Sequence, residues 1–156
     1  MSDLHNEFSA YTIPKLPGDE KRILILAGDI FTDSMVLGAV EWMKIASEQF
    51  YQVIMVYGNH DYYHGNIADS LKERIKLFEE YFDNVHILNN DYRIFDGTVF
   101  FGGTLWTDLN DPLHIYNKRY MNDFRYIKRK PGGDLFNTVS WLNKHIETAT
   151  FIKDYA

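Results

Sequence analysis

Two continuous apolar runs dominate the N-terminal half of the chain. They cover residues 23–27 and 53–57 and end at Gly28 and Gly58, respectively. Apolar runs of this length without polar alternation are typical of strands buried on both faces. We therefore predict two fully buried strands, each of which turns sharply at a glycine.

Stretches with helical periodicity follow these runs. Asp33 or Ser34 is a candidate cap for a first helix, Asn66 for a second, and a third is expected to begin near Asp134. Apolar residues spaced three or four positions apart predict one buried face for each helix. These faces comprise Val36, Leu37, Val40 and Met43; Ile67, Leu71, Ile75, Phe78 and Phe82; and Leu135, Val139, Leu142 and Ile146.

A short strand at residues 85–88 and a hairpin are predicted between the second and third helices. The hairpin strands, 92–95 and 98–101, flank Asp96-Gly97, a strong signal for a two-residue turn. The order of elements predicts one α/β domain over residues 1–156, with parallel strands in its first half. Ligands of such sheets bind at the loops beyond the carboxyl ends of the strands.

Composition narrows the possible functions. The chain has no cysteine, which excludes disulfides, cysteine-ligated zinc and a thiol nucleophile, and is consistent with a reducing cytoplasm. Its net charge of −6 argues against binding nucleic acid by bulk electrostatics. No apolar run approaches the roughly 20 residues of a membrane helix, and the first twenty residues contain no signal-peptide core. We expect a cytoplasmic protein.

Candidate metal ligands follow both predicted strands. Asp29 comes directly after Gly28, and Asn59 and His60 come directly after Gly58. Near the N-terminus, Asp3 and His5 would lie on the same side of an extended segment. Carboxylate, amide and imidazole groups together suit a hard or borderline divalent ion.

Each motif also has a simpler explanation. Asp-x-His is common by chance, and Gly-Asp after a strand is often only a turn that caps the next helix. Residues 58–61, Gly-Asn-His-Asp, are more specific, since a histidine directly after a buried strand has no obvious packing role. The three motifs in this order favour a metal site over a purely structural explanation.

These motifs resemble the first three signature motifs of calcineurin-like metallophosphoesterases. Residues 103–108 and 121–124 are also similar to segments of small bacterial and phage members, so the resemblance covers nearly the whole chain. It implies part of an α/β/β/α sandwich that hydrolyses phosphate esters by means of a hydroxide bridging two metal ions. It further implies a small phosphate ester or a phosphorylated molecule as substrate.

By this resemblance, Asp3 and His5 bind a first metal, Asp29 bridges both metals and Asn59 binds the second. Oxygen and imidazole ligands suit manganese, iron, zinc or nickel.

The resemblance implies that His60 protonates or stabilises the leaving oxygen, a task that suits an imidazole. Asp61 would then orient His60, as carboxylates orient catalytic histidines elsewhere.

The later motifs of the family, which supply three further histidine ligands, have no counterpart here. No Gly-His pair occurs, and the remaining histidines, His64, His86, His114 and His145, lie in no matching context. Only Met1 and Ser2 precede Asp3, so we expect a frayed terminus and a fragment that lacks the first strand and the C-terminal motifs. Such a chain should bind metal weakly and turn over little substrate. The alternative is an inactive remnant that serves as a binding or structural module.

Two further features have open interpretations. A basic stretch would attract an anionic substrate or simply form a solvated loop face. Tyr62 and Tyr63 would wall the pocket or pack in the core, whereas Trp106 and Trp141 are expected in the core. The basic stretch comprises Lys118, Arg119, Arg125, Lys128, Arg129 and Lys130.

Overall fold

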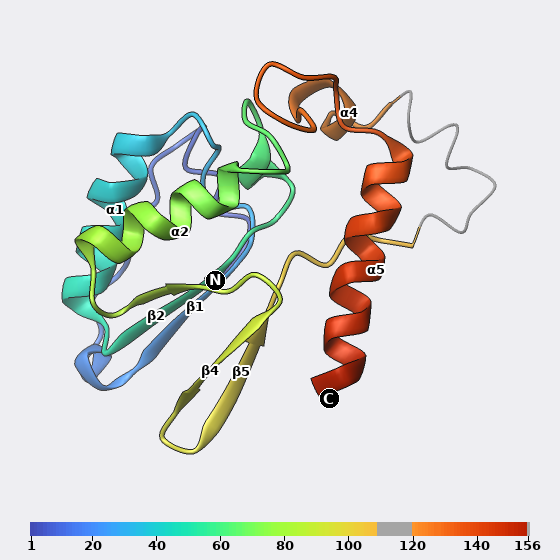
Figure 1. Cartoon of the computed structure of the whole chain (residues 1–156). Helices are drawn as coiled ribbons and strands as arrows, with labels where there is room; N and C mark the ends of the chain where they lie inside the picture. Colours follow the sequence, from blue (N-terminus) through green and yellow to red (C-terminus); the bar gives the residue numbers. More distant parts are fainter. Residues whose placement is uncertain (109–119, 156) are drawn as a thin grey trace.

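A parallel sheet forms the centre of the molecule. Figure 1 shows the computed structural model, which describes residues 1–108 and 120–155. The sheet contains β1 (Ile23–Ala27), β2 (Gln52–Val56) and β3 (Val85–Ile87) in the order β1-β2-β3. This confirms the predicted parallel strands in the first half of the chain.

Two helices connect the strands as crossovers. α1 (Val36–Gln49) links β1 to β2, and α2 (Ser70–Tyr81) links β2 to β3. Both helices lie together over the same side of the sheet in Figure 1. Consecutive crossovers of one hand, moving one strand at a time, place helices on one face in this way.

The first strand is not buried on both faces as predicted. Leu24 and Leu26 are buried, whereas Ile25 between them is 46% exposed. In β2, by contrast, Val53, Ile54 and Met55 are all buried. β1 lies at an edge of this sheet and is left open on the face of Ile25, whereas the central strand β2 is covered on both faces.

The start of α1 differs from the prediction, and its predicted buried face is confirmed only at Met43 and, in part, at Val40. The helix begins after Met35 without a side-chain cap, and Leu37 is 79% exposed. The apolar residues of α1 form two neighbouring lines along the helix, and their spacing alone does not show which line packs against the sheet. The buried residues are Ala39, Trp42, Met43 and Ala46.

α2 begins at Ser70, later than expected. The side-chain oxygen of Asn66 accepts hydrogen bonds from the backbone N–H groups of Ala68 and Asp69, so it caps the turn before the helix. Leu71 and Phe78 are buried as predicted.

The hairpin is confirmed. β4 (Asp91–Phe95) pairs antiparallel with β5 (Thr98–Gly102). Asp96 and Gly97 have φ angles of 49° and 78°, as the favoured two-residue hairpin turn requires.

The C-terminal part contains α4 (Asp123–Tyr126) and α5 (Thr138–Tyr155). Trp141 on α5 is buried against Trp106, at a ring-centroid distance of 4.6 Å, which confirms both as core residues. The predicted face of this helix is exposed instead. The aromatic core residues Trp106, Phe124 and Phe136 contact Trp141, so the side of α5 that carries Trp141 faces the core. The exposed residues are Leu135, Val139, Leu142 and Ile146. Within the described ranges, no helix has the length and apolarity needed to cross a membrane.

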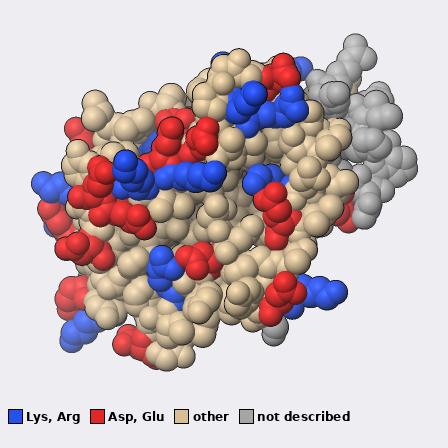
Figure 2. All heavy atoms as spheres, viewed as in Figure 1, with Lys and Arg blue, Asp and Glu red and all other residues tan. Residues whose placement is uncertain are grey.

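Charged side chains of both signs are interspersed on the face shown in Figure 2. In the predicted basic stretch, Arg125 and residues 128–130 are exposed, and Arg129 forms an ion pair with Asp134. This fits a solvated loop face. Lys118, Arg119 and His114 lie outside the described residues.

Candidate metal centre

The two strand-end loops are in direct backbone contact. A Cβ atom on Gly28 would lie 2.9 Å from the nitrogen and 3.0 Å from the Cα of Gly58. Gly28 also has a φ of 86°, which favours glycine. Asp29 follows with a φ of 56°, so its side chain leaves the strand direction at once. The contact explains why glycine occupies positions 28 and 58 in the loops that follow the two strands.

Asp61 holds the two loops together. Its carboxylate accepts hydrogen bonds from the backbone N–H groups of Asp29 (2.8 Å), Ile30 (3.2 Å), Phe31 (3.0 Å) and Gly58 (2.8 Å). Burial raises the pKa of Asp61 to about 7, against the opposing effect of these donors. The oxygens of Asp61 thus bond to main-chain amides. The hydrogen bond that we expected between Asp61 and His60, the histidine beside it, is not formed. Asp61 is a structural clamp.

The N-terminal segment is neither frayed nor extended. Met1 exchanges hydrogen bonds with β1 through Ile25 and Ala27, at 2.7 Å each. The backbone N–H groups of Asp3 and His5 then donate to the carbonyls of Gly28 and Asp29, at 3.0 Å each. These contacts anchor the segment beside the edge strand.

Asp3 and His5 still reach a common point, by a route other than strand alternation. Both have positive φ angles, 52° and 47°, so the segment coils around the end of β1. One ligand atom from each of Asp3, His5 and Asp29 lies within 4.8 Å of the others. Asp29 is held by the backbone N–H of His60, which donates to its Oδ1 at 2.9 Å. Three predicted ligands thus converge.

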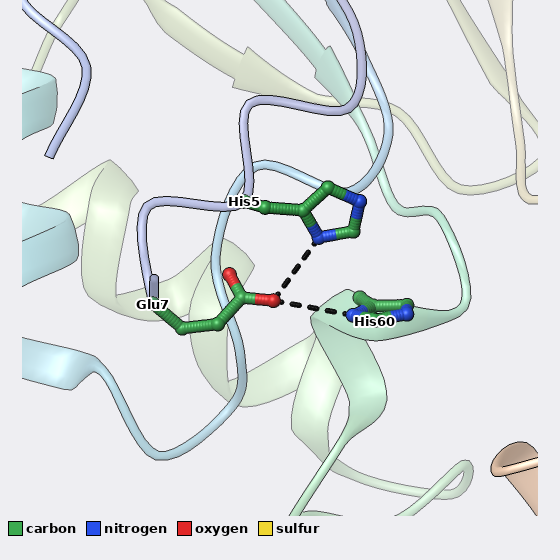
Figure 3. A group of neighbouring side chains, drawn as sticks. All are labelled: His5, Glu7 and His60. Atoms are coloured by element: carbon green, nitrogen blue, oxygen red, sulfur yellow. Dashed lines mark hydrogen bonds and ion pairs between the residues drawn. The ribbon is translucent and has the colours of Figure 1, made fainter. Parts of the chain in front are cut away.

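A second cluster shares His5 with the first. Figure 3 shows Glu7 between two imidazoles, with Oε1 lying 3.1 Å from Nδ1 of His5 and 3.1 Å from Nδ1 of His60. Burial acts to raise the pKa of Glu7, but hydrogen bonds from its own backbone, His5 and His60 outweigh burial and lower it. Sequence reasoning missed Glu7. Its signal is the position two residues after His5, in an Asp-x-His-x-Glu pattern.

Asn59 lies in a third group of polar side chains. Its Nδ2 donates to the hydroxyl of Tyr63 at 3.4 Å, and that hydroxyl donates to Oδ2 of Asp123 at 3.4 Å. Asp123 is buried, which raises its pKa, and its Oδ1 has no hydrogen-bond partner within the described residues. Unpartnered buried oxygens are costly, and a cation would satisfy one. The position of Asp123 was signalled only by the resemblance of residues 121–124.

Both tyrosines after the loop are buried in the core, and Tyr63 also contacts the site. Tyr63 stacks on His60, with ring centroids 4.1 Å apart and planes inclined by 22°. Tyr62 packs edge-on against Tyr57 at 5.0 Å, within the core. Tyr63 is therefore part of the site.

A cleft of about 650 Å³ opens beside Gly58 and Asn59. Its walls include the aromatic side chains of Tyr57, Trp106 and Trp141. It adjoins the polar loops on the side of residues 103–107 and α5, and offers mainly apolar surface next to the candidate ligands.

The other described histidines lie outside both clusters. His64 is exposed beside Tyr126, and His86 is on β3 with Nε2 at 2.8 Å from Oε1 of Gln52. Nδ1 of His145 on α5 is 2.6 Å from the carbonyl oxygen of Trp106. This agrees with the absence of a matching family motif around these histidines in the sequence.

Comparisons with known proteins place this geometry in a family. The family described as calcineurin-like phosphoesterase matches residues 1–153. The fold is similar to the crystal structure of phosphopantetheinyl hydrolase (PptH) from Mycobacterium tuberculosis, with a TM-score of 0.64 and 17% identity over 99% of this chain and 61% of that one. This likeness confirms the predicted fold class.

A curated relative is the uncharacterised protein L509 of Acanthamoeba polyphaga mimivirus. It is 25% identical over 162 residues, which cover 92% of this chain and 56% of the viral protein. The chain thus spans only about three fifths of the length of either protein. With the family match over nearly its whole length, the chain belongs to the calcineurin-like phosphoesterase family.

Proposed function

We propose that this chain provides metal-binding and proton-transfer residues of a phosphoester hydrolase. The observation that carries the proposal is the convergence of Asp3, His5 and Asp29, whose ligand atoms lie within 4.8 Å of one another. Two carboxylates and an imidazole fit a divalent ion such as manganese, iron, zinc or nickel. Family membership supports the same chemistry.

Asp3 and His5 would hold one ion, and Asp29 would be shared with a second ion held by Asn59. The unpartnered oxygen of buried Asp123 adds a candidate ligand near Asn59. Ions bound there would acidify water and polarise the phosphoryl oxygens.

His60 would transfer a proton to the leaving oxygen. Its Nδ1 faces Glu7 and its ring is stacked on Tyr63, which leaves Nε2 for the substrate. The organic part of the ester would enter the cleft beside Asn59. Small phosphate esters with an apolar or aromatic group suit its walls.

Metal titration and hydrolysis assays test the proposal. Calorimetry with Mn²⁺ should detect binding to the wild-type chain, and Asp29→Asn should weaken it by more than about 100-fold, because removing a ligand exceeds the 10–100-fold effect of an outer-shell change. His60→Gln should retain Mn²⁺ affinity while lowering the kcat for bis-p-nitrophenyl phosphate by about 10²–10⁴-fold, the usual worth of a general acid.

Asp83→Asn, which changes an exposed carboxylate in the turn between α2 and β3, is the control. Wild-type Mn²⁺ affinity in the Asp29 variant would contradict the metal site. Mn²⁺ binding by the wild type without EDTA-sensitive hydrolysis would favour an inactive binding module.

A further inference from the structure

Glu7 contacts two histidines that lie far apart in the sequence. A turn closed by the hydrogen bond from the Phe8 N–H to the His5 carbonyl (2.9 Å) directs the Glu7 side chain back toward His5. His60 arrives from the loop after β2, 53 residues away. The two imidazole rings meet edge to face, with centroids 4.4 Å apart. One carboxylate oxygen therefore serves both rings (Figure 3).

This contact determines which nitrogen of each ring carries hydrogen. An ionised carboxylate only accepts hydrogen bonds, so the imidazole nitrogen facing it must be a donor. Both 3.1 Å contacts use Nδ1, so Nδ1 carries the hydrogen in His5 and in His60. The lone pair of each neutral ring then lies on Nε2.

The two rings gain different properties from the same constraint. In His5, an unprotonated Nε2 is available to a metal ion, because a ligating imidazole must be unprotonated at the coordinating atom. In His60, Nδ1 keeps its hydrogen in the neutral and the charged ring alike. Its Nε2, the ring nitrogen that does not face Glu7, is then the one left to exchange a proton with a substrate.

We propose that Glu7 is a positioning residue that fixes the Nδ1–H tautomer and the orientation of both His5 and His60. The inference rests on the proposed function for its catalytic meaning, but the hydrogen-bond arrangement is testable without metal or substrate. Carboxylates that bond to the second nitrogen of a histidine ligand are a recurrent device for orienting it. Here one carboxylate would couple a metal ligand to the group that protonates the leaving oxygen.

The first test is the tautomer itself. Long-range ¹H–¹⁵N spectra of histidine-labelled, chelator-treated protein at pH 8 should show the Nδ1–H tautomer for His5 and His60. Glu7→Gln should lower the Nδ1–H fraction at both rings, because an amide can donate as well as accept. Glu80→Gln, an exposed glutamate on α2, should leave both spectra unchanged. An Nε2–H tautomer at either ring in the wild type would overturn the proposal, and this result needs no folded variant.

The second test concerns metal and rate. Glu7→Gln should weaken Zn²⁺ binding by about 10–100-fold, the usual effect of losing a carboxylate behind a histidine ligand. It should lower kcat for bis-p-nitrophenyl phosphate with little change in KM, and Glu7→Asp should restore part of the loss. Loss of one bound Zn²⁺ per chain would instead make Glu7 a ligand and overturn the positioning role. If the wild type binds no metal, the proposed function fails, while the tautomer spectra still decide the role of Glu7.

Discussion

Replacing Gly58 with alanine tests whether the close packing of the strand-end loops holds Asp29 in place. A Cβ atom at this position would lie 2.1 Å from Oδ1 of Asp29, 2.7 Å from its nitrogen and 2.8 Å from its Cγ. The substitution leaves every candidate ligand chemically intact. Any loss of metal binding or activity can therefore be attributed to a shift of the Asp29 carboxylate and not to its removal.

The expected magnitude follows from the overlap. An ordinary contact needs a separation of at least 3.4 Å, so the carboxylate must move by roughly 1 Å, and interiors this dense resist such shifts. The shift also disturbs the hydrogen bond from the His60 N–H to Oδ1. Overpacking should reduce the free energy of unfolding by about 1–3 kcal/mol, and a displacement of about 1 Å should lower kcat/KM by about 100-fold.

Urea denaturation measures the loss of stability, and the hydrolysis of bis-p-nitrophenyl phosphate measures the loss of kcat/KM. Mn²⁺ calorimetry reports whether the displaced Asp29 still binds metal normally. Gly38→Ala is the matched control, because its Cβ would meet only Met35 Cε at 3.5 Å, within helix α1. Alanine is the better helix former by about 1 kcal/mol, so this variant should be more stable and bind Mn²⁺ as the wild type does. Gly58→Ala with wild-type stability and wild-type Mn²⁺ affinity would refute the packing argument.

Two further predictions concern stability. Asn84→Ala should lower the free energy of unfolding by about 1–2 kcal/mol, because the Asn84 amide donates to the Ser47 and Phe50 carbonyls at the end of α1. Urea denaturation measures this loss. A loss no larger than that of Asn143→Ala, which changes an exposed residue, would contradict the prediction. Burial, followed by the charge of Arg93, lowers the pKa of His86. As pH falls below about 6.5, His86 is protonated in the unfolded state before it is protonated in the folded state. The free energy of unfolding therefore decreases toward acid pH. His86→Gln should lose less stability than the wild type between pH 7.5 and 5.5, and an equal loss in both would count against the assignment.

Short-range patterns in the sequence predicted much of the fold. The two apolar runs, the helical stretches and the Asp96-Gly97 turn were confirmed, because strand and hairpin preferences depend on neighbouring residues. The candidate ligands were also predicted from a short-range pattern. Glycine followed by polar residues at a strand end is a local signal, and it pointed to Asp29 and Asn59 without knowledge of the packing.

Only the tertiary structure decided which faces are buried and which groups meet. The sequence predicted both Trp141 and Leu142 to be buried, and only the structure shows that Trp141 faces the core while Leu142 is exposed. The outcome depends on the aromatic surface beneath α5. Glu7 joins His60 across 53 residues, and Asp61 bonds to amides of the other loop. Such contacts arise when crossovers bring separate strand ends to one edge of a sheet. Sequence periodicity carries no information on distances between segments, so these partners required the folded chain.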